Sequence, residues 1–230
     1  MSWAELFNGL AYVVGGFVFF LAARKRKLAT DGFLTLALVG MVAGVVGAKV
    51  TQLLFQGVAV SQAFDPRLGG RALLGGMICG WIGVEVAKRQ LGIKRSTGDL
   101  FALALTSGEA VGRIGCFLGG CCYGSETTCS WAVYQHDAYR HPAQIYSAVT
   151  AAAMFVGLAW LYWKLNLKEG MLFRLYLLLF GASRFVIEFF RQRDSLIFGL
   201  SPMQWFCLEL IVTAAVLLAL PVLKARRARA

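Results

Sequence analysis

The chain has 230 residues, of which 58% are hydrophobic and only 15% are charged, and its net charge at pH 7 is +11. A soluble domain of this length cannot bury so much apolar surface, so the composition excludes an ordinary soluble globular protein. The basic residues stand in short clusters between apolar runs. This pattern is typical of cytoplasmic membrane loops and argues against nucleic acid as a partner.

Seven apolar stretches approach or reach the length of a membrane-spanning helix, which is about 20 residues. They are residues 7–23, 33–55, 72–87, 98–118, 142–164, 170–190 and 202–223. The first lacks the basic leader and the cleavage site of a signal peptide, so we expect it to be retained. The sequence thus predicts an all-α, polytopic membrane protein with about seven transmembrane helices, in which residues 1–230 form a single transmembrane domain.

The basic clusters predict how these helices are oriented. They lie after the first, third, fifth and seventh stretches, at residues 24–27, 88–95, 164–168 and 224–229. Because such clusters mark cytoplasmic loops, we expect the N-terminus outside and the C-terminus in the cytoplasm. The longest outer loop is then residues 119–141, and we expect it to cover the functional site.

Ionisable residues are costly within a membrane and suggest function, and in two of the predicted helices they form stripes along one face. Glu109 and Arg113 lie four residues apart on one helical face, and Arg184, Glu188 and Arg191 form a second stripe. Structural ion pairs would give the same pattern. The second stripe, however, has two arginines and one glutamate, so it keeps a positive charge for an anionic ligand. The planar guanidinium fork suits phosphate.

A segment rich in small residues, GRIGCFLGGCCYG at residues 112–124, closes the helix that carries Arg113. Its glycines, which include Gly124, would let backbone donors approach a ligand. We expect Arg113 to face that ligand, and a phospholipid headgroup is the phosphate available at this depth.

Three further segments follow in order: RHPAQIY at residues 140–146, GASRFVIEFFR at 181–191 and LSPMQ at 200–204. Together with residues 112–124 they resemble the successive motifs of the prolipoprotein diacylglyceryl transferase family. The resemblance implies an enzyme of lipoprotein biosynthesis in the bacterial inner membrane. Such an enzyme moves the diacylglyceryl group of phosphatidylglycerol to the cysteine thiol of a prolipoprotein signal peptide and releases glycerol phosphate.

The resemblance also implies which residues form the site. Arg113 and Arg184 match functional arginines of the family, and His141, Gln144 and Tyr146 match its histidine-proline motif. From its position beside Pro142, at the start of the fifth predicted helix, we expect His141 to be the catalytic base, and a structural residue at the helix entry is the alternative. The arginines would hold the phosphate and stabilise the charge that grows on the leaving group. The expected substrate-binding residues are Glu109, Gly124, Gln144, Tyr146, Glu188 and Arg191.

The sequence departs from the family pattern around the acceptor. Leu74 stands where the family has a histidine, Cys116 and Gly119 replace asparagines, and Cys121 replaces an acidic residue. These changes leave the arginines in place and leave the acceptor open. The functions that we consider are therefore transfer to a thiol or another acceptor, non-catalytic phospholipid binding or translocation, and thiol oxidoreduction in the membrane.

Cys116, Cys121 and Cys122 form a cluster at the outer end of the fourth predicted helix. A thiolate near Arg113 would be a nucleophile, which makes Cys116 a catalytic candidate and the other two a candidate thiol site. An oxidising exterior favours a disulfide instead, with Cys129 as a further partner.

Two other interpretations of these cysteines remain open. One is a metal ion whose ligands are completed by His136 or His141, and the other is inert packing. The C-x4-C-C spacing lacks the paired C-x2-C of a structural zinc site. Accordingly, the sequence predicts neither a metal nor an organic cofactor.

Overall fold

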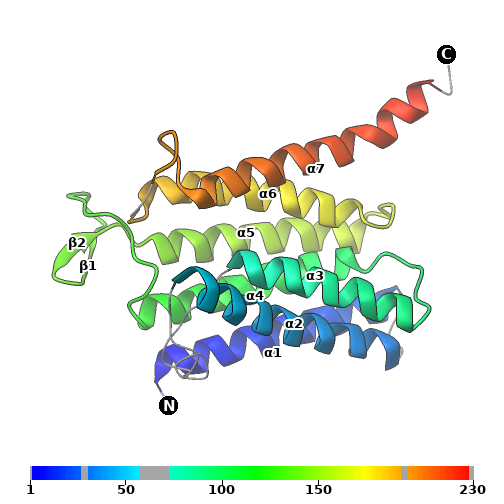
Figure 1. The fold of residues 1–230 in the computed structure, drawn as a ribbon, viewed down its shortest axis with the longest axis horizontal. Coiled ribbons are helices and arrows are strands. Elements are labelled where there is room, and N and C mark those ends of the chain that lie inside the picture. The colour runs from blue at the N-terminus through cyan, green and yellow to red at the C-terminus, as the bar shows by residue number, and fades with distance from the viewer. Residues whose placement is uncertain (1, 27–30, 57–72, 193–195, 228–230) are drawn as a thin grey trace. The chain divides into compact units, whose positions relative to one another are not determined.

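The computed structural model describes residues 2–26, 31–56, 73–192 and 196–227, and Figure 1 shows its elements. Within these ranges it contains seven α-helices, a two-stranded hairpin and a 3-10 turn. The helices are α1 (Trp3–Lys25), α2 (Asp31–Gln56), α3 (Leu73–Gln90), α4 (Gly98–Leu118), α5 (Ala143–Lys164), α6 (Met171–Ile187) and α7 (Pro202–Arg227). Each of the seven predicted stretches overlaps one of these helices, with bounds that differ by a few residues.

Five helices of the described part are long and apolar enough to cross a membrane, namely α1, α2, α4, α5 and α7. They expose large apolar side chains: Val149 and Val156 of α5, for example, are 62% and 67% exposed. Lipid must cover a surface of this kind. The chain is therefore an all-α, multi-pass membrane protein. The two remaining helices are shorter, with 18 residues in α3 and 17 in α6.

The described residues form two compact units. The first contains residues 1–22 and 96–230, and the second contains residues 23–95. In the second unit α2 and α3 pack through their glycines, because a Cβ atom added at Gly76 or at Gly80 would lie 3.2 Å from a carbonyl oxygen of α2. Small residues allow this close approach of two helix backbones. The single domain expected from the sequence stays a prediction.

In the first unit α5 packs against α4 and α6, and α6 also packs against α4 and α7. The buried carboxylate of Asp99, in the first turn of α4, fixes the start of α6. It accepts hydrogen bonds from the backbone N–H groups of Gly170 (3.0 Å) and Phe173 (3.1 Å). These amides belong to the first turn of α6, where unpaired donors and the helix dipole favour a negative charge.

This contact places two arginines at equal distances along α4 and α6. Arg113 lies 14 residues after Asp99 in α4, and Arg184 lies 14 residues after Gly170, which precedes α6. At 1.5 Å per residue, each arginine is about 21 Å along its helix from the shared contact. Because α4 and α6 start together and pack together, their C-terminal halves bring Arg113 and Arg184 to the same end of the first unit.

The loop of residues 119–141, for which we keep the name outer loop after its predicted side of the membrane, contains a hairpin that the sequence analysis did not predict. Strand β1 (Val133–Gln135) pairs with β2 (Ala138–Arg140) in antiparallel register. The two turn residues, His136 and Asp137, have φ values of 50° and 59°. Positive φ at both positions is typical of a type I′ turn, which glycine or asparagine usually marks. The sequence His136-Asp137 therefore did not indicate a hairpin turn.

Candidate functional site

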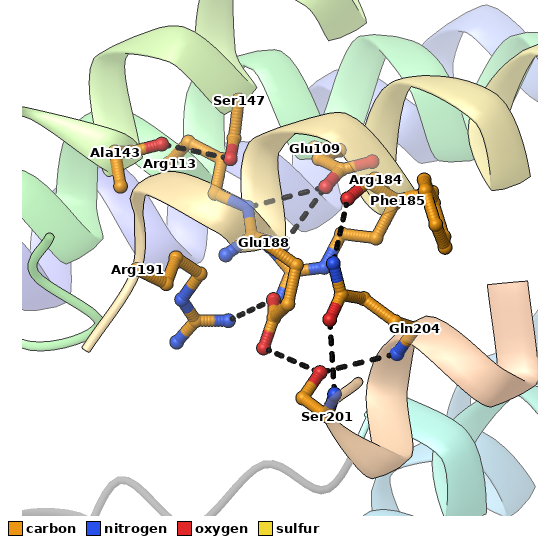
Figure 2. A network of polar contacts seen from close by, with 10 residues as sticks. All are labelled: Glu109, Arg113, Ala143, Ser147, Arg184, Phe185, Glu188, Arg191, Ser201 and Gln204. Carbon is orange, nitrogen blue, oxygen red and sulfur yellow. Dashed lines mark hydrogen bonds and ion pairs between the residues drawn. The ribbon is translucent and has the colours of Figure 1, made fainter. Parts of the chain in front are cut away.

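Five charged residues from the C-terminal half of α4, from the end of α6 and from the 3-10 turn that follows α6 (Glu188–Phe190, capped by Arg191) form one group (Figure 2). We call it the arginine cluster: Glu109, Arg113, Arg184, Glu188 and Arg191. Arg113 donates to Oε1 of Glu109 from Nε (3.1 Å) and Nη2 (3.0 Å). Oε2 of Glu188 lies 3.0 Å from Nη2 of Arg184 and 3.5 Å from Nη1 of Arg191. Arg184 also interacts electrostatically with Arg113. The structure thus brings the two predicted stripes together.

Several donors of the arginine cluster are left over. Within the described residues, Nε and Nη1 of Arg184 and Nε of Arg191 are buried and have no hydrogen-bond partner. A buried donor without a partner is costly, and a charged one more so. Three arginines against two glutamates also leave one net positive charge. The arginine cluster is therefore suited to an anion whose oxygens accept hydrogen bonds.

A small cavity lies beside Arg184. Its volume is about 10 Å³, and its polar lining comes from Glu109, Ser147, Thr150, Ser183 and Arg184. This space is about the size of one water molecule. A phosphate group that binds there requires the surrounding side chains to shift.

Ser201 and Gln204 support the arginine cluster, and neither was predicted as a site residue. Oγ of Ser201 donates to Oε1 of Glu188 (3.5 Å). The backbone N–H of Ser201 donates to Oε1 of Gln204 (2.9 Å), and the backbone N–H of Gln204 donates to Oγ of Ser201 (3.2 Å). This reciprocal pair is a capping box that starts α7, with Pro202 in the first helical position. The sequence Ser-Pro-Met-Gln could have revealed it.

The three predicted cysteines also come together, and we call them the thiol group: Cys116, Cys121 and Cys122. Their Sγ atoms all lie within 4.8 Å of one another. All six cysteines of the chain are free in the structure, so no disulfide joins them. Neither histidine belongs to the group, although the metal interpretation expected one.

The end of α4 explains why these thiols meet. The backbone N–H of Cys121 donates to the carbonyl oxygen of Cys116 (3.1 Å), and that of Gly120 donates to Phe117 (3.2 Å). With φ of +66° at Gly120, these bonds define a Schellman motif, which sets the side chains of Cys116 and Cys121 beside each other. Cys122 also has a positive φ, of 60°.

Side chains from outside α4 hold this turn in place. Nε2 of His136 donates to the carbonyl oxygen of Gly120 (2.6 Å), and Nε2 of Gln144 donates to that of Cys121 (2.9 Å). Gln144 is 1% exposed. The structure therefore places Gln144, a predicted substrate contact, against the turn of the thiol group.

The thiols of this turn differ in acidity. Hydrogen bonds from Cys116 and Cys121 lower the pKa of the Cys122 thiol, and the positive charges of Arg191 and Arg113 lower it further. Hydrogen bonding to Cys116 and Cys122, together with burial, raises the pKa of the Cys121 thiol. Cys122 is therefore the more acidic of the two, and the thiol group lies within the electrostatic reach of the arginine cluster.

His141 and Tyr146 make a third group with Trp131, which we call the loop anchor. The hydroxyl of Tyr146 accepts a hydrogen bond from Nε1 of Trp131 (2.7 Å) and lies 3.2 Å from Nδ1 of His141. The ring of His141 also meets Phe190 edge-on at 5.2 Å. Nδ1 of His141 also lies 3.9 Å from Sγ of Cys129. This nitrogen of the predicted base thus already has partners within the loop and α5.

The glycines around Arg113 serve packing. A Cβ atom at Gly115 would lie 3.1 Å from the carbonyl oxygen of Ala4, and one at Gly112 would lie 3.4 Å from Cβ of Ala11. Gly124 forms a β-bridge with Arg191, and a Cβ atom there would meet the carbonyl oxygens of His141 and Phe190. These glycines let α4 approach α1 and let the outer loop approach the end of α6. The expectation that they present backbone donors to a ligand stays a prediction.

A larger concavity, of about 800 Å³, lies over the outer loop. Its lining residues are Glu126, Thr127, Thr128, Cys129, Ser130, Ala132, Ala138 and Tyr139. This lining contains no basic side chain, so the concavity lacks the donors that a phosphate needs. The arginine cluster is the better candidate for an anionic ligand.

Leu74, at the position of the family histidine, lies in the first turn of α3. Its side chain lies outside the described residues.

Comparisons with known proteins agree with the motifs. A family model described as prolipoprotein diacylglyceryl transferase matches residues 2–220. Phosphatidylglycerol-prolipoprotein diacylglyceryl transferase 2 of Clostridium perfringens is 26% identical over 235 positions, which cover 95% of this chain and 90% of that protein. The transferase of Aeromonas hydrophila is 32% identical over 204 positions, or 81% and 74% of the two chains. That of Clostridium tetani is 30% identical over 184 positions, or 74% and 72%.

Proposed function

Because the chain belongs to the prolipoprotein diacylglyceryl transferase family, we propose that it transfers the diacylglyceryl group of phosphatidylglycerol to the cysteine thiol of a prolipoprotein. The relatives carry both substrates in their names. The observation in this chain that carries the proposal is the set of buried, unpartnered donors on Arg184 and Arg191. A single phosphodiester charge would neutralise the net positive charge of the arginine cluster.

In this proposal Arg184 is the main phosphate ligand. Its Nη2 is held by Glu188, which leaves Nε and Nη1 for the lipid. These two donors leave opposite edges of the guanidinium plane, so each would donate to a different acceptor oxygen of the bound lipid, and an ammonium group cannot reproduce this fixed planar arrangement. Glu188 also holds Arg191, and Glu109 holds Arg113, so each glutamate positions an arginine.

The transfer itself is a displacement at carbon. The acceptor sulfur attacks the lipid methylene carbon that carries the phosphate ester, and the carbon–oxygen bond breaks. Glycerol phosphate leaves with both electrons of that bond, so it gains a second negative charge. Arginines placed beforehand around the phosphate stabilise this growing charge, which is often the largest contribution to catalysis.

The acceptor thiol must also lose its proton. His141 is the predicted base, and its Nδ1 faces the Tyr146 hydroxyl, which Trp131 also contacts. This geometry supports an anchoring role for His141 between the outer loop and α5. Cys116 is the other predicted catalytic residue, and its place in the thiol group is taken up in the next subsection.

The proposal includes a topology with seven spans in the bacterial inner membrane, where α3 and α6 complete the five longer spans. Basic residues support the orientation, because they occupy the last turns of α1 (Arg24, Lys25), α3 (Lys88, Arg89) and α5 (Lys164). These helix ends would face the cytoplasm, with the N-terminus outside and the C-terminus inside.

A transfer assay tests this function. Purified protein would be placed in vesicles of phosphatidylglycerol labelled in the diacylglyceryl part and offered a peptide with a lipobox cysteine. We expect label on the peptide, and a loss of about 10²- to 10³-fold in Arg184→Ala. Arg174→Ala is the matched control, because Arg174 lies on the same helix and donates to the Leu217 carbonyl oxygen (3.0 Å). Folded wild-type protein that binds the lipid but labels no peptide would contradict the proposal.

A further inference from the structure

The thiol group has a geometry that suits a metal ion. The Sγ atoms of Cys116, Cys121 and Cys122 all lie within 4.8 Å of one another. Zinc–sulfur bonds of about 2.3 Å in a tetrahedral site set the sulfurs about 3.8 Å apart. Small rotations of the three side chains are therefore enough to bring them to one ion.

The backbone holds the thiols in this arrangement at some cost. A Schellman motif needs one residue with positive φ, which Gly120 supplies, yet Cys122 adopts positive φ as well. For a residue with a Cβ atom this conformation costs roughly 1–2 kcal/mol. Strain of this kind persists only where the surroundings enforce it, and it concentrates at ligand sites. Here His136 and Gln144 fix the carbonyl groups of the turn.

The thiol group offers three ligands and an open side. Among the described residues, no histidine, aspartate or glutamate joins the three sulfurs. Structural zinc sites use four protein ligands, whereas catalytic sites use three and keep one position for an exogenous ligand. Cys121 is exposed, while Cys116 and Cys122 are half-buried, so the thiol group is accessible from the side of Cys121.

The charges of the neighbourhood also balance. Three thiolates with one divalent ion carry a single negative charge. Arg113 and Arg191 lie close enough to Cys122 to interact with it electrostatically, and the arginine cluster has one net positive charge. A soft divalent ion at the thiols is therefore compatible with the arginines beside it.

We propose that Cys116, Cys121 and Cys122 bind a thiophilic divalent metal ion of the Zn²⁺ type, whose open coordination position takes the acceptor thiol. This inference rests on the proposed transfer reaction. The metal ion would supply the deprotonation of the acceptor thiol. The arginine cluster does not supply a base for this step, because Glu109 and Glu188 are both ion-paired with arginines.

The chemistry of this step balances without a further reactant. A thiol that coordinates zinc gives up its proton, which passes to water. The coordinated sulfur then forms its bond to the lipid methylene carbon, while glycerol phosphate leaves with the electrons of the carbon–oxygen bond. The product is a neutral thioether, which is a weaker ligand than a thiolate. It therefore leaves the ion, and the position opens for the next acceptor.

Cobalt is a spectroscopic probe of the site. Full-length protein, reduced and freed of metal in detergent, should bind one Co²⁺ per chain with sulfur-to-cobalt charge-transfer absorption. Replacing Cys116, Cys121 or Cys122 with serine should weaken binding by more than ~100-fold, beyond the ~10- to 100-fold loss typical of outer-shell changes. Cys129→Ser is the matched control in the same loop. No cobalt absorption in the wild type, or equal binding in Cys116→Ser, would overturn the site.

Alkylation tests the unmodified chain, so the result does not depend on the folding of a variant. Zn²⁺ should protect the three thiols of the thiol group from iodoacetamide and leave Cys129 reactive. Equal labelling with and without Zn²⁺ would overturn metal binding.

The acceptor position has its own test. A lipobox peptide should add sulfur-to-cobalt absorption to the Co²⁺ protein, and the same peptide with serine in place of cysteine should not. An unchanged spectrum with the cysteine peptide would refute acceptor binding at the ion.

The transfer assay separates this inference from the proposed function. If metal-free protein transfers lipid at the full rate, the metal inference is wrong and the transferase function stands. If the Co²⁺ and Zn²⁺ proteins bind the peptide thiol but transfer no lipid, the metal site stands and the proposed function fails.

Discussion

The arginine cluster and the thiol group both include residues of α4, yet they are held in different ways. In the arginine cluster, side chains at regular helical spacings neutralise one another: Arg184 and Glu188 are only 6% and 7% exposed. The thiol group lies just past the helix end, is partly exposed, and depends on two positive φ angles. A substitution in the arginine cluster should therefore act by changing the balance of buried charges. A substitution in the thiol group should act by changing the backbone geometry.

Removing one charge from the arginine cluster should have the largest effect. Glu188→Gln keeps the shape of the side chain but leaves Arg184 and Arg191 without their carboxylate. Breaking a buried ion pair from one side costs ~3–5 kcal/mol, and we expect a loss of this size in the free energy of unfolding. Denaturant titration in detergent would measure it.

The matched control is Glu126→Gln. Glu126 pairs with Arg140 at 3.1 Å, but its side chain is 70% exposed. An exposed pair contributes about 0–1 kcal/mol, so the control should unfold almost as the wild type does. Equal losses in the two variants would mean that burial does not distinguish the arginine cluster.

Arg184→Lys should have the next largest effect, on the rate of transfer. Lysine keeps the positive charge beside Glu188 but lacks the planar guanidinium whose Nε and Nη1 donors are left for the lipid. We expect transfer to fall about 10²-fold or more, with a much smaller change in stability. Arg174→Lys on the same helix should leave transfer unchanged. Wild-type transfer in Arg184→Lys would show that charge alone is enough at this position.

The contrast between the two groups also explains what the sequence predicted. Helical periodicity predicted the pairs Glu109–Arg113 and Arg184–Glu188, and both are formed. The seven helical stretches were also predicted, because apolar runs and the basic clusters between them can both be read directly from the sequence. Bringing α4 and α6 into register required a tertiary contact, the cap from Asp99 to the start of α6. Spacing within one helix does not report such a contact.

The features that the sequence analysis missed depend on turns. The hairpin turn uses His136 and Asp137 where glycine or asparagine would have given a signal. The cluster of three cysteines was predicted, but the Schellman motif at Gly120 that brings them together was not, and neither was the contact of Gln144 with that turn. By contrast, the capping box from Ser201 to Gln204 had a readable signature. Its link to Glu188 becomes visible only after α7 is folded back on α6.

Gly120→Ala tests the geometry of the thiol group directly. The added Cβ atom would lie 3.5 Å from Nε2 of His136, an ordinary contact, so the cost comes from the positive φ of +66°. We expect a loss of roughly 1–2 kcal/mol in unfolding free energy and weaker Co²⁺ absorption, because Cys121 moves away from Cys116. Gly157→Ala in α5 is the control, since no atom lies within 4 Å of its added Cβ atom. Unchanged cobalt binding in Gly120→Ala would show that the motif does not hold the thiols.

The smallest effect should come from Tyr146→Phe, which separates anchoring from proton transfer. Phenylalanine keeps the ring beside Phe190 but removes the hydroxyl that contacts Trp131 and His141. Loss of these hydrogen bonds should cost about 0.5–1.5 kcal/mol of stability. If His141 only anchors the loop, transfer at a permissive temperature should stay within a few-fold of wild type. A fall of ~10²-fold or more, the range of general acid–base catalysis, would instead mean that the proton of the acceptor thiol passes through Tyr146 and His141. Deprotonation of the acceptor would then not depend on a metal ion at the thiol group, and metal-free protein should keep its activity.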